Sequence, residues 1–391
     1  MHFKFFTSIL FFSCLFLIFS GNQLYSQTGN IIIGNNITLN SKILDEERTI
    51  QVYLPDSYST AKANYPVVYL MDGEGHFSYT AGLLQFFARN NMAPEMILVG
   101  VPNTFRNRDF TPIADVTVAG SGGADNFLKV LKEELIPMIE EKYRTLPYRI
   151  MIGHSLTGMY CFYTMLKEPG LFNSFIAVSP WVIYHNNFLV DFINKELPIH
   201  TSLKKEIYFT AGSLEQQDLL TTFNRFNEIL KTKAPEDLTW NYKLMPNENH
   251  GSQFLLAVYD GLNKIFLGWN LPDDVASKGL NSVLNHYKKL SQKFGFDVLP
   301  QEAALNNIGY YFLQKKNYDE AVNIFKKNVE LYPESANVYD SLGEAYENMT
   351  NYELALKNYD KAYTIGKAIN HPFLSTFQRN FERAKNTLQN K

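Results

Sequence analysis

Cysteine is scarce in this chain, which has only Cys14 and Cys161 among its 391 residues. Cys14 lies in an N-terminal apolar stretch, so a chain that loses this stretch keeps one cysteine and can form no internal disulfide. Cys161 sits among apolar and aromatic residues, which favours a small buried side chain over a catalytic thiol. Folding must therefore rest on packing, and 46% apolar residues are enough for a large core.

The chain also lacks a long basic run, and its formal net charge is only -3. Proteins that bind nucleic acid by neutralising phosphates carry an excess of Lys and Arg. We therefore exclude a nucleic-acid partner and expect a small molecule or a protein instead.

The N-terminus is typical of a secretion signal. Lys4 precedes a largely apolar stretch from Phe5 to Phe19, and smaller, more polar residues follow. A membrane-spanning helix usually needs about 20 apolar residues, so the stretch is short for an anchor. We expect residues 1–26 to be a signal peptide, the mature protein to be periplasmic or extracellular, and no membrane span to remain after cleavage. A retained anchor is the alternative.

Apolar patterns after the signal predict a mostly parallel sheet. From Asn30 to about Pro55 apolar residues alternate with polar ones, as in antiparallel edge strands. Later apolar runs are short and continuous, as in strands covered on both faces, and helical periods lie between several of them. These runs are 67–71, 96–99, 150–152, 175–178 and 207–209, and a final strand is expected around 240–244. The expected fold class of residues 27–270 is α/β, with helices on both faces of the sheet.

The last part of the chain repeats with a period of 34 residues. The matched pairs are Gly309 and Gly343, Asn317 and Asn351, Ala321 and Ala355, and Phe325 and Tyr359. The period and its small and aromatic positions resemble the tetratricopeptide repeat, in which a small residue lets two helices approach closely. Two units rarely close a core, so flanking helices are expected over 277–294 and 373–388. Residues 271–300 then form a linker helix, and residues 301–391 form an all-α domain that could bind a protein partner.

The most informative motif follows the strand at 148–152. Gly153-His154-Ser155-Leu156-Thr157-Gly158 joins this strand to a helical stretch. Such a turn thrusts a serine out of the carboxyl edge of the sheet, where its hydroxyl can attack an acyl carbon and the next amide can face the oxyanion. Ser155 is the candidate nucleophile, and the Leu156 amide is one oxyanion donor. Thr157 stands where the strict pattern has glycine, and an ordinary strand-to-helix turn is the alternative.

A serine nucleophile needs a base, for which histidine is suited. Of the eight histidines, only His250 sits in a loop between a last strand and a last helix, whereas His154 is expected to point away from the site. The third triad member should follow the penultimate strand. Glu215 lies nearest that strand's end, Asp218 is the competitor, and a dyad without either acid stays open.

A second oxyanion donor is expected after the strand at 67–71. Two glycines in Asp72-Gly73-Glu74-Gly75 let the backbone bend toward Ser155, so the Glu74 amide can join the Leu156 amide. A simple tight turn is the alternative.

Several motifs together resemble one family. They are Leu70-Met71-Asp72-Gly73, Val99-Gly100-Val101-Pro102-Asn103, Gly153-His154-Ser155-Leu156-Thr157-Gly158, Ala177-Val178-Ser179-Pro180 and Asn249-His250-Gly251-Ser252. In this order they look like the branch of the α/β-hydrolases that includes esterase D, feruloyl esterases and ferri-enterobactin esterases. The resemblance covers Asn30 to Trp269 and implies an α/β-hydrolase fold, with Ser155 as nucleophile, His250 as base and Glu215 as acid.

Other side chains are candidates for substrate binding. Trp181 and Tyr184 could stack on an aromatic or sugar-like acyl group, and Arg106 or Arg108 could meet an anionic group. An ion pair between Arg108 and Asp109 is the alternative for that arginine.

The sequence thus predicts a secreted serine esterase that hydrolyses carboxylic esters through an acyl-enzyme on Ser155. It needs neither a metal nor an organic cofactor. Siderophore esters and feruloyl-type esters are suggested by the resemblance alone. An inactive hydrolase scaffold whose repeats bind a partner and an acyltransferase are the alternatives.

Overall fold

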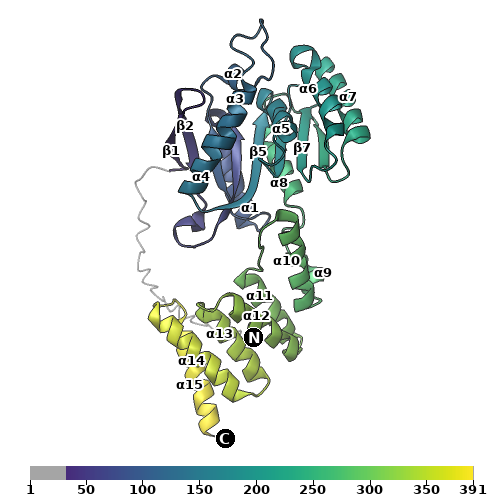
Figure 1. The fold of residues 1–391 in the computed structure, drawn as a ribbon. Helices are drawn as coiled ribbons and strands as arrows, with labels where there is room; N and C mark the ends of the chain where they lie inside the picture. Colours follow the sequence, from purple (N-terminus) through teal and green to yellow (C-terminus); the bar gives the residue numbers. More distant parts are fainter. Residues whose placement is uncertain (1–31, 391) are drawn as a thin grey trace, which may run out of the picture. The chain divides into compact units, whose positions relative to one another are not determined.

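The computed structural model describes residues 32–390, so the signal peptide expected over 1–26 lies outside the described residues. Eight strands form one sheet in the order β1-β2-β4-β3-β5-β6-β7-β8 (Figure 1). The strands are β1 Asn35–Ser41, β2 Glu46–Tyr53, β3 Tyr65–Met71, β4 Ile97–Val101, β5 Thr145–His154, β6 Ser174–Val178, β7 Glu206–Gly212 and β8 Thr239–Met245.

The sheet is mostly parallel, as the apolar runs predict. β1 pairs with β2 and β2 with β4 in the antiparallel sense, whereas every pairing from β4 through β8 is parallel. Parallel strands bring their carboxyl ends to one edge of the sheet. The loops after β3, β5, β6, β7 and β8 therefore meet at that edge.

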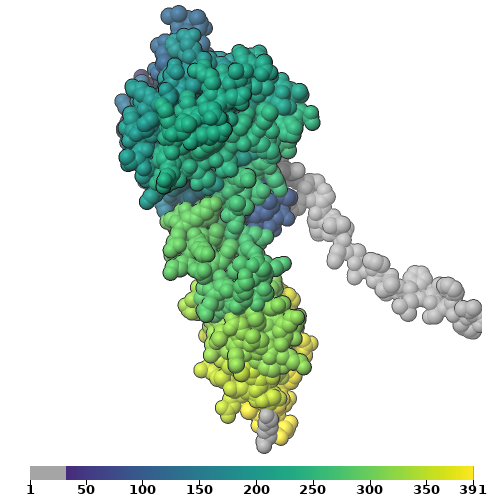
Figure 2. Space-filling model, turned by 90° about the vertical axis from the view of Figure 1, so that its right-hand side faces the viewer, coloured from purple at the N-terminus to yellow at the C-terminus, as the bar shows by residue number. Residues whose placement is uncertain are grey.

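Helices cover both faces of the sheet. Along β3, Val67 and Tyr69 enter one apolar cluster, whereas Val68 and Leu70 enter the other, as the period of two in a strand requires. The first cluster contains side chains of α2 (Arg106–Phe110), α3 (Ala124–Lys129), η2 (Val130–Leu135), α4 (Ile136–Lys142), α5 (Leu156–Lys167), α6 (Tyr184–Glu196), η3 (Leu197–Ile199) and α7 (Gln217–Lys233). The second contains side chains of α1 (Gly73–Arg89), α8 (Phe254–Ile265) and α10 (Leu280–Phe294). Figure 2 shows the teal-coloured face that α6 and α7 form.

The C-terminal helices form the repeats that the 34-residue period predicts. α11 (Glu302–Gln314) pairs with α12 (Tyr318–Leu331), α13 (Ala336–Asn348) pairs with α14 (Tyr352–Ala368), and α15 (Leu374–Gln389) packs on α14. A Cβ atom on Gly309 would lie 2.4 Å from the Phe325 ring, and one on Gly343 would lie 2.7 Å from the Tyr359 ring. Only glycine therefore lets the two helices of each unit approach this closely.

The helix between the sheet and the repeats packs against both. Phe294, at the end of α10, lies 5.2 Å from the ring of Tyr148 on β5 and 5.3 Å from that of Phe266. The same apolar cluster continues into Leu305 of α11 and Phe325 of α12. No helix of residues 32–390 is both long enough and apolar enough to cross a membrane.

Candidate active site

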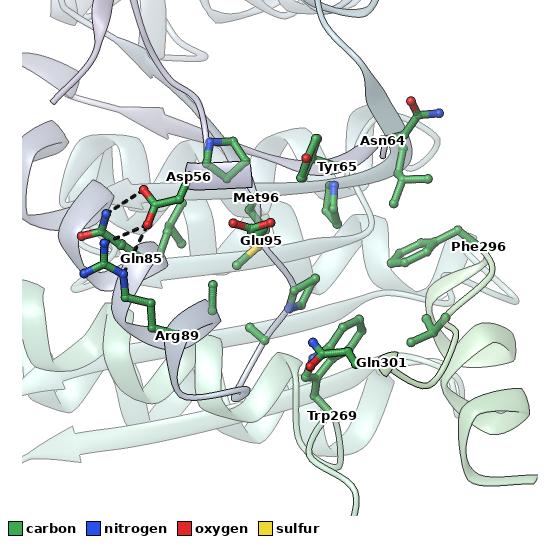
Figure 3. Close-up of a pocket in the computed structure, with 18 of the residues that line it drawn as sticks. Asp56, Asn64, Tyr65, Gln85, Arg89, Glu95, Met96, Trp269, Phe296 and Gln301 are labelled. Carbon is green, nitrogen blue, oxygen red and sulfur yellow. Dashed lines mark hydrogen bonds and ion pairs between the residues drawn. The ribbon is translucent and has the colours of Figure 1, made fainter. Parts of the chain in front are cut away.

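A hollow of about 370 Å³ lies at the amino ends of β3 and β4 (Figure 3). Tyr65, Met96 and Trp269 are among its walls, and two of its charged side chains are paired, since Asp56 accepts hydrogen bonds from Arg89 and from Gln85. The described residues that line it include no serine, cysteine or histidine. This hollow therefore offers no pair of a nucleophile and a base.

A second hollow, the carboxyl-edge pocket, has a volume of about 520 Å³. Ser155, Glu215 and His250 all line it. They come from the loops after β5, β7 and β8, so the parallel sheet brings together residues that are far apart in sequence. Clefts at the carboxyl ends of parallel strands are the usual location of sites in open α/β sheets.

Ser155 occupies a strained turn between β5 and α5, with φ 59° and ψ -114°. Its amide donates to the Val178 carbonyl at 2.9 Å, and its carbonyl accepts from the Trp181 amide at 3.0 Å. A Cβ atom on Gly153 would lie 2.3 Å from the Thr157 carbonyl oxygen. The glycine makes the tight turn sterically possible, and the hydrogen bonds to the end of β6 and to the loop that follows it hold the strained serine in place.

Glu215 and His250 form the central hydrogen bond of the pocket. Glu215 Oε2 lies 2.7 Å from His250 Nδ1, and the carboxylate is only 3% exposed, whereas the imidazole is 44% exposed. Burial alone would raise the pKa of Glu215, but hydrogen bonds from His250, the Gly212 amide, Ser179 and Gln253 outweigh it and lower the pKa to about 2. The carboxylate is therefore ionised at neutral pH and directs the imidazole.

Ser179 and Gln253 are two members of this network that the sequence reasoning missed. Ser179 Oγ lies 2.7 and 2.8 Å from the two Glu215 oxygens, and Gln253 Nε2 donates to Oε1 at 2.7 Å. Gln253 is fixed in turn, because its Oε1 accepts from Thr210 at 2.8 Å. Ser179 lies in one of the motifs that carry the resemblance, which could have drawn attention to it. For Gln253 the sequence gives no comparable signal.

His154 does not point away from the site as expected. Its ring lies 4.7 Å from the His250 ring, and its Nε2 lies 2.8 Å from the His250 carbonyl oxygen. Burial, with a further contribution from the neighbouring His250 imidazole, lowers the pKa of His154 to about 4. A neutral His154 can donate Nε2–H to this carbonyl and so help to fix the loop that carries His250.

The two expected oxyanion donors are both amides in the first turn of a helix. Leu156 begins α5, and Glu74 is the second residue of α1. Such amides have no carbonyl one turn earlier to bond with, so they are free to face an anion. The Glu74 side chain accepts from the Asn103 amide at 3.1 Å and from Asn103 Nδ2 at 2.5 Å, which ties this turn to the loop after β4.

Trp181 lines the carboxyl-edge pocket together with the apolar side chains of Ile183, Leu214 and Leu219. Tyr184, the second aromatic candidate, does not, because its ring is buried beside Trp181 and its hydroxyl donates to the Ile113 carbonyl at 2.9 Å. Asp218, the competing acid, lies in the first turn of α7 and is not among the described residues that line the pocket, whereas Glu215 contacts the His250 imidazole.

The two candidate arginines are paired with carboxylates instead of facing the pocket. Arg106 makes a two-pronged contact with Asp72, at 2.7 and 3.0 Å. Arg108 contacts Glu46 at 2.7 Å and Asp109 at 2.8 Å, which agrees with the ion-pair alternative. Because buried or half-buried carboxylates already neutralise them, neither guanidinium is free to bind an anionic substrate.

Cys161 is fully buried, and burial raises the pKa of its thiol well above the usual range. It therefore cannot supply a thiolate at neutral pH. Within residues 32–390, no group of three or more His, Cys, Asp or Glu side chains is arranged to hold a metal ion.

Comparison with known proteins assigns the two parts of this chain to known families. Residues 41–253 match the family described as "Putative esterase", and residues 300–368 match the tetratricopeptide repeat. The protein YbbA of Bacillus subtilis is 31% identical over 206 residues, which are 48% of this chain and 79% of YbbA. The ferri-bacillibactin esterase BesA of the same organism is 29% identical over 200 residues, 44% of this chain and 68% of BesA.

Among solved structures, an IroE-like serine hydrolase from Shewanella oneidensis is similar, with a TM-score of 0.65 and 25% identity over 76% of this chain and 99% of the other. The α/β-hydrolase fold predicted from the motifs is thus confirmed, as is the C-terminal repeat. The chain belongs to the esterase family of α/β-hydrolases, extended by tetratricopeptide repeats.

Proposed function

We propose that this protein is a secreted serine esterase that cleaves carboxylic esters through an acyl-enzyme on Ser155. The observation that carries the proposal is the 2.7 Å contact between Glu215 and His250 in a pocket that Ser155 also lines. The α/β domain of residues 27–270 supplies this chemistry. The expected signal peptide supports export to the periplasm or beyond.

The protonation of His250 follows from its neighbour. Because ionised Glu215 can only accept, the proton of a neutral His250 resides on Nδ1, which leaves the Nε2 lone pair free. Nε2 removes the Ser155 proton as Oγ attacks the ester carbon, and the Leu156 and Glu74 amides stabilise the oxyanion. The imidazolium returns its proton to the leaving alcohol, and water then cleaves the acyl-enzyme in the same way. Removing one oxyanion donor typically costs about 3 kcal/mol of barrier lowering.

We propose an uncharged, aromatic acyl group as the favoured substrate. Trp181, Ile183 and Leu214 give the pocket an apolar wall, and no lysine or arginine is among the described residues that line it. The two arginines expected to bind an anion, Arg106 and Arg108, are already paired with carboxylates. Of the two ester classes suggested by the relatives, a feruloyl-type ester fits this wall better than an anionic siderophore ester.

The repeats of residues 301–391 are proposed to bind a protein partner, with 271–300 as the linker. Their two helical hairpins resemble units that serve as interaction modules.

The test of the esterase proposal is labelling with a fluorophosphonate, followed by peptide mapping and by p-nitrophenyl acetate assays. The label should attach to Ser155, and Ser155→Ala should lower kcat by at least about 10⁴-fold. A label on another residue, or a rate that survives in Ser155→Ala, would contradict the proposal. Product analysis with an added alcohol would separate hydrolysis from acyl transfer.

A further inference from the structure

Thr157 links two loops that the proposed reaction needs at a fixed separation. These are the elbow, residues 153–158, and the oxyanion loop, residues 72–75. Thr157 Oγ1 lies 2.7 Å from Asp72 Oδ2, and among residues 32–390 this is the one direct hydrogen bond between the elbow and the oxyanion loop. The side chain is fully buried. A glycine, which the strict elbow pattern has at this position, could make no such contact.

The single proton of the Thr157 hydroxyl is directed toward Asp72. Oγ1 accepts from the His154 amide at 2.7 Å and could donate either to Asp72 at 2.7 Å or to the His154 carbonyl at 2.9 Å. A carboxylate is the stronger acceptor, and Arg106 already donates to the His154 carbonyl at 3.1 Å. The hydroxyl thus holds the elbow backbone on one side and Asp72 on the other.

Asp72 is a rigid anchor for this contact. It directly precedes α1 and adopts the left-handed conformation, with φ 56°, which is uncommon for a residue other than glycine. Its carboxylate is 10% exposed and also accepts from Arg106 Nε at 2.7 Å and from Asn103 Nδ2 at 2.7 Å. A shift of Asp72 would therefore move the first turn of α1, which carries the Glu74 amide.

We propose that Thr157 is a positioning residue, which acts through Asp72 to set the separation between the Leu156 and Glu74 amides. This inference rests on the proposed function, because it concerns the oxyanion site of that reaction. Thr157 touches no reacting atom. A glycine at this position would leave the two loops without a direct hydrogen bond, whereas the Thr157 hydroxyl joins the elbow to the oxyanion loop, and these loops supply the two oxyanion donors.

The test compares Thr157→Val, which keeps the shape and removes the hydroxyl, with Thr157→Ser, which keeps the hydroxyl. Misplacing a catalytic group by about 1 Å can cost 10²-fold in rate, so Thr157→Val should lower kcat by about 10- to 100-fold with little change in KM. The inhibition constant of a trifluoromethyl ketone, which forms an oxyanion on the serine, should rise by the same factor. Thr157→Ser should stay within about threefold of the wild type on both measures.

Thr164→Val is the matched control, because Thr164 is also fully buried and lies two turns further along α5. It should leave the ketone's inhibition constant unchanged. If Thr157→Val does not fold, Thr157→Ala removes the same hydroxyl and must show the same selective loss of kcat.

The inference is overturned if Thr157→Val binds the ketone as the wild type does, or if Thr164→Val weakens it equally. A wild-type protein that neither turns over esters nor binds the ketone would instead refute the proposed function.

Discussion

The catalytic part and the repeat part both contain residues with positive φ, but they use them differently. In the repeats, Lys316 (φ 60°) and Thr350 (φ 59°) are exposed, lie 34 positions apart, and each follows the first helix of a hairpin. In the catalytic part, Asp72, Ser155 and Ser179 directly follow β3, β5 and β6. Asp72 and Ser179 are buried, and side-chain hydrogen bonds hold them.

This difference separates two uses of unusual backbone. A left-handed residue after a helix is an ordinary way to end it, and it recurs because the unit recurs. A buried, strained residue at a strand end persists only where its surroundings fix it, and such residues cluster at functional sites. Changes to the network that holds these strand-end residues should therefore alter kcat, whereas changes to the packing of the repeats should alter stability alone.

The largest effect that we predict for the catalytic part is the loss of kcat in Glu215→Gln. The amide cannot act as an anionic acceptor for His250 Nδ1–H, so the imidazole loses both its orientation and the stabilisation of its charged form. Replacing the triad acid by its amide in a serine protease lowers kcat by about 10⁴-fold, and we expect a loss of about 10³-fold or more here. Steady-state kinetics with p-nitrophenyl acetate measure it.

Asp218→Asn is the control for Glu215→Gln. It lies three residues further on, in the first turn of α7, and should keep kcat within about twofold because a helix-terminal charge contributes only to local stability. A greater loss in Asp218→Asn than in Glu215→Gln would reverse the assignment of the acid.

The pH dependence of the free energy of unfolding should reveal the contribution of the ionised Glu215 carboxylate. The pKa of Glu215 is about 2 in the folded protein, below the ordinary value of 4.5, so ionised Glu215 stabilises the fold above pH 4.5. This contribution, about 3 kcal/mol for a shift of this size, disappears as the pH falls from 4.5 through about 2. Urea unfolding should therefore separate the wild type from Glu215→Gln widely at pH 7 and much less at pH 3. An equal gap at both pH values would mean that the charge is not responsible.

A smaller effect should appear in the choice of substrate. Methyl 4-nitrocinnamate and methyl 4-carboxycinnamate have nearly the same shape, but only the second is anionic at pH 7. Glu215 is ionised, and no lysine or arginine is among the described residues that line the pocket, so kcat/KM for the anionic ester should be lower by about tenfold. Each kcat/KM is first divided by the rate constant for hydrolysis of that ester by hydroxide, which corrects for the difference in intrinsic reactivity.

Leu214→Lys, at an exposed position on the rim of the pocket, should narrow this gap, whereas Leu214→Gln should not. Equal rates on the two esters with the wild type would remove the argument for an uncharged acyl group.

The repeat part and the catalytic part also differ in how much of their structure can be predicted from the sequence. The repeats are predictable because the glycine and the aromatic residue that pack together lie close in the chain. The pair Gly309 and Phe325 recurs 34 residues later as Gly343 and Tyr359, so the same local pattern predicts the helix packing in both units. Local apolar patterns likewise predict the region of the two edge strands, β1 and β2, and the positions of β3 to β7.

The network around the site depends instead on contacts between distant loops. Gln253 is hydrogen-bonded to Thr210 and Glu215, and Arg106 is hydrogen-bonded to Asp72 and to the His154 carbonyl. No local sequence pattern predicts these contacts. Arg106 and Arg108 illustrate the resulting errors, because a sequence shows a positive charge but not the carboxylate that already neutralises it.

The smallest predicted effect concerns the repeats and uses two glycines in helices. Gly309→Ala adds a methyl group 2.4 Å from the Phe325 ring, an overpacking that costs about 1 to 3 kcal/mol, whereas alanine's better helix propensity returns up to about 1 kcal/mol. The net loss should be about 1 kcal/mol in urea unfolding, with kcat unchanged. Gly82→Ala in α1, where no atom lies within 4 Å of the new methyl group, gains propensity without overpacking and should stabilise the protein. If Gly309→Ala instead lowered kcat, the repeats would be coupled to the catalytic part, and the separation of the two parts into chemistry and packing would fail.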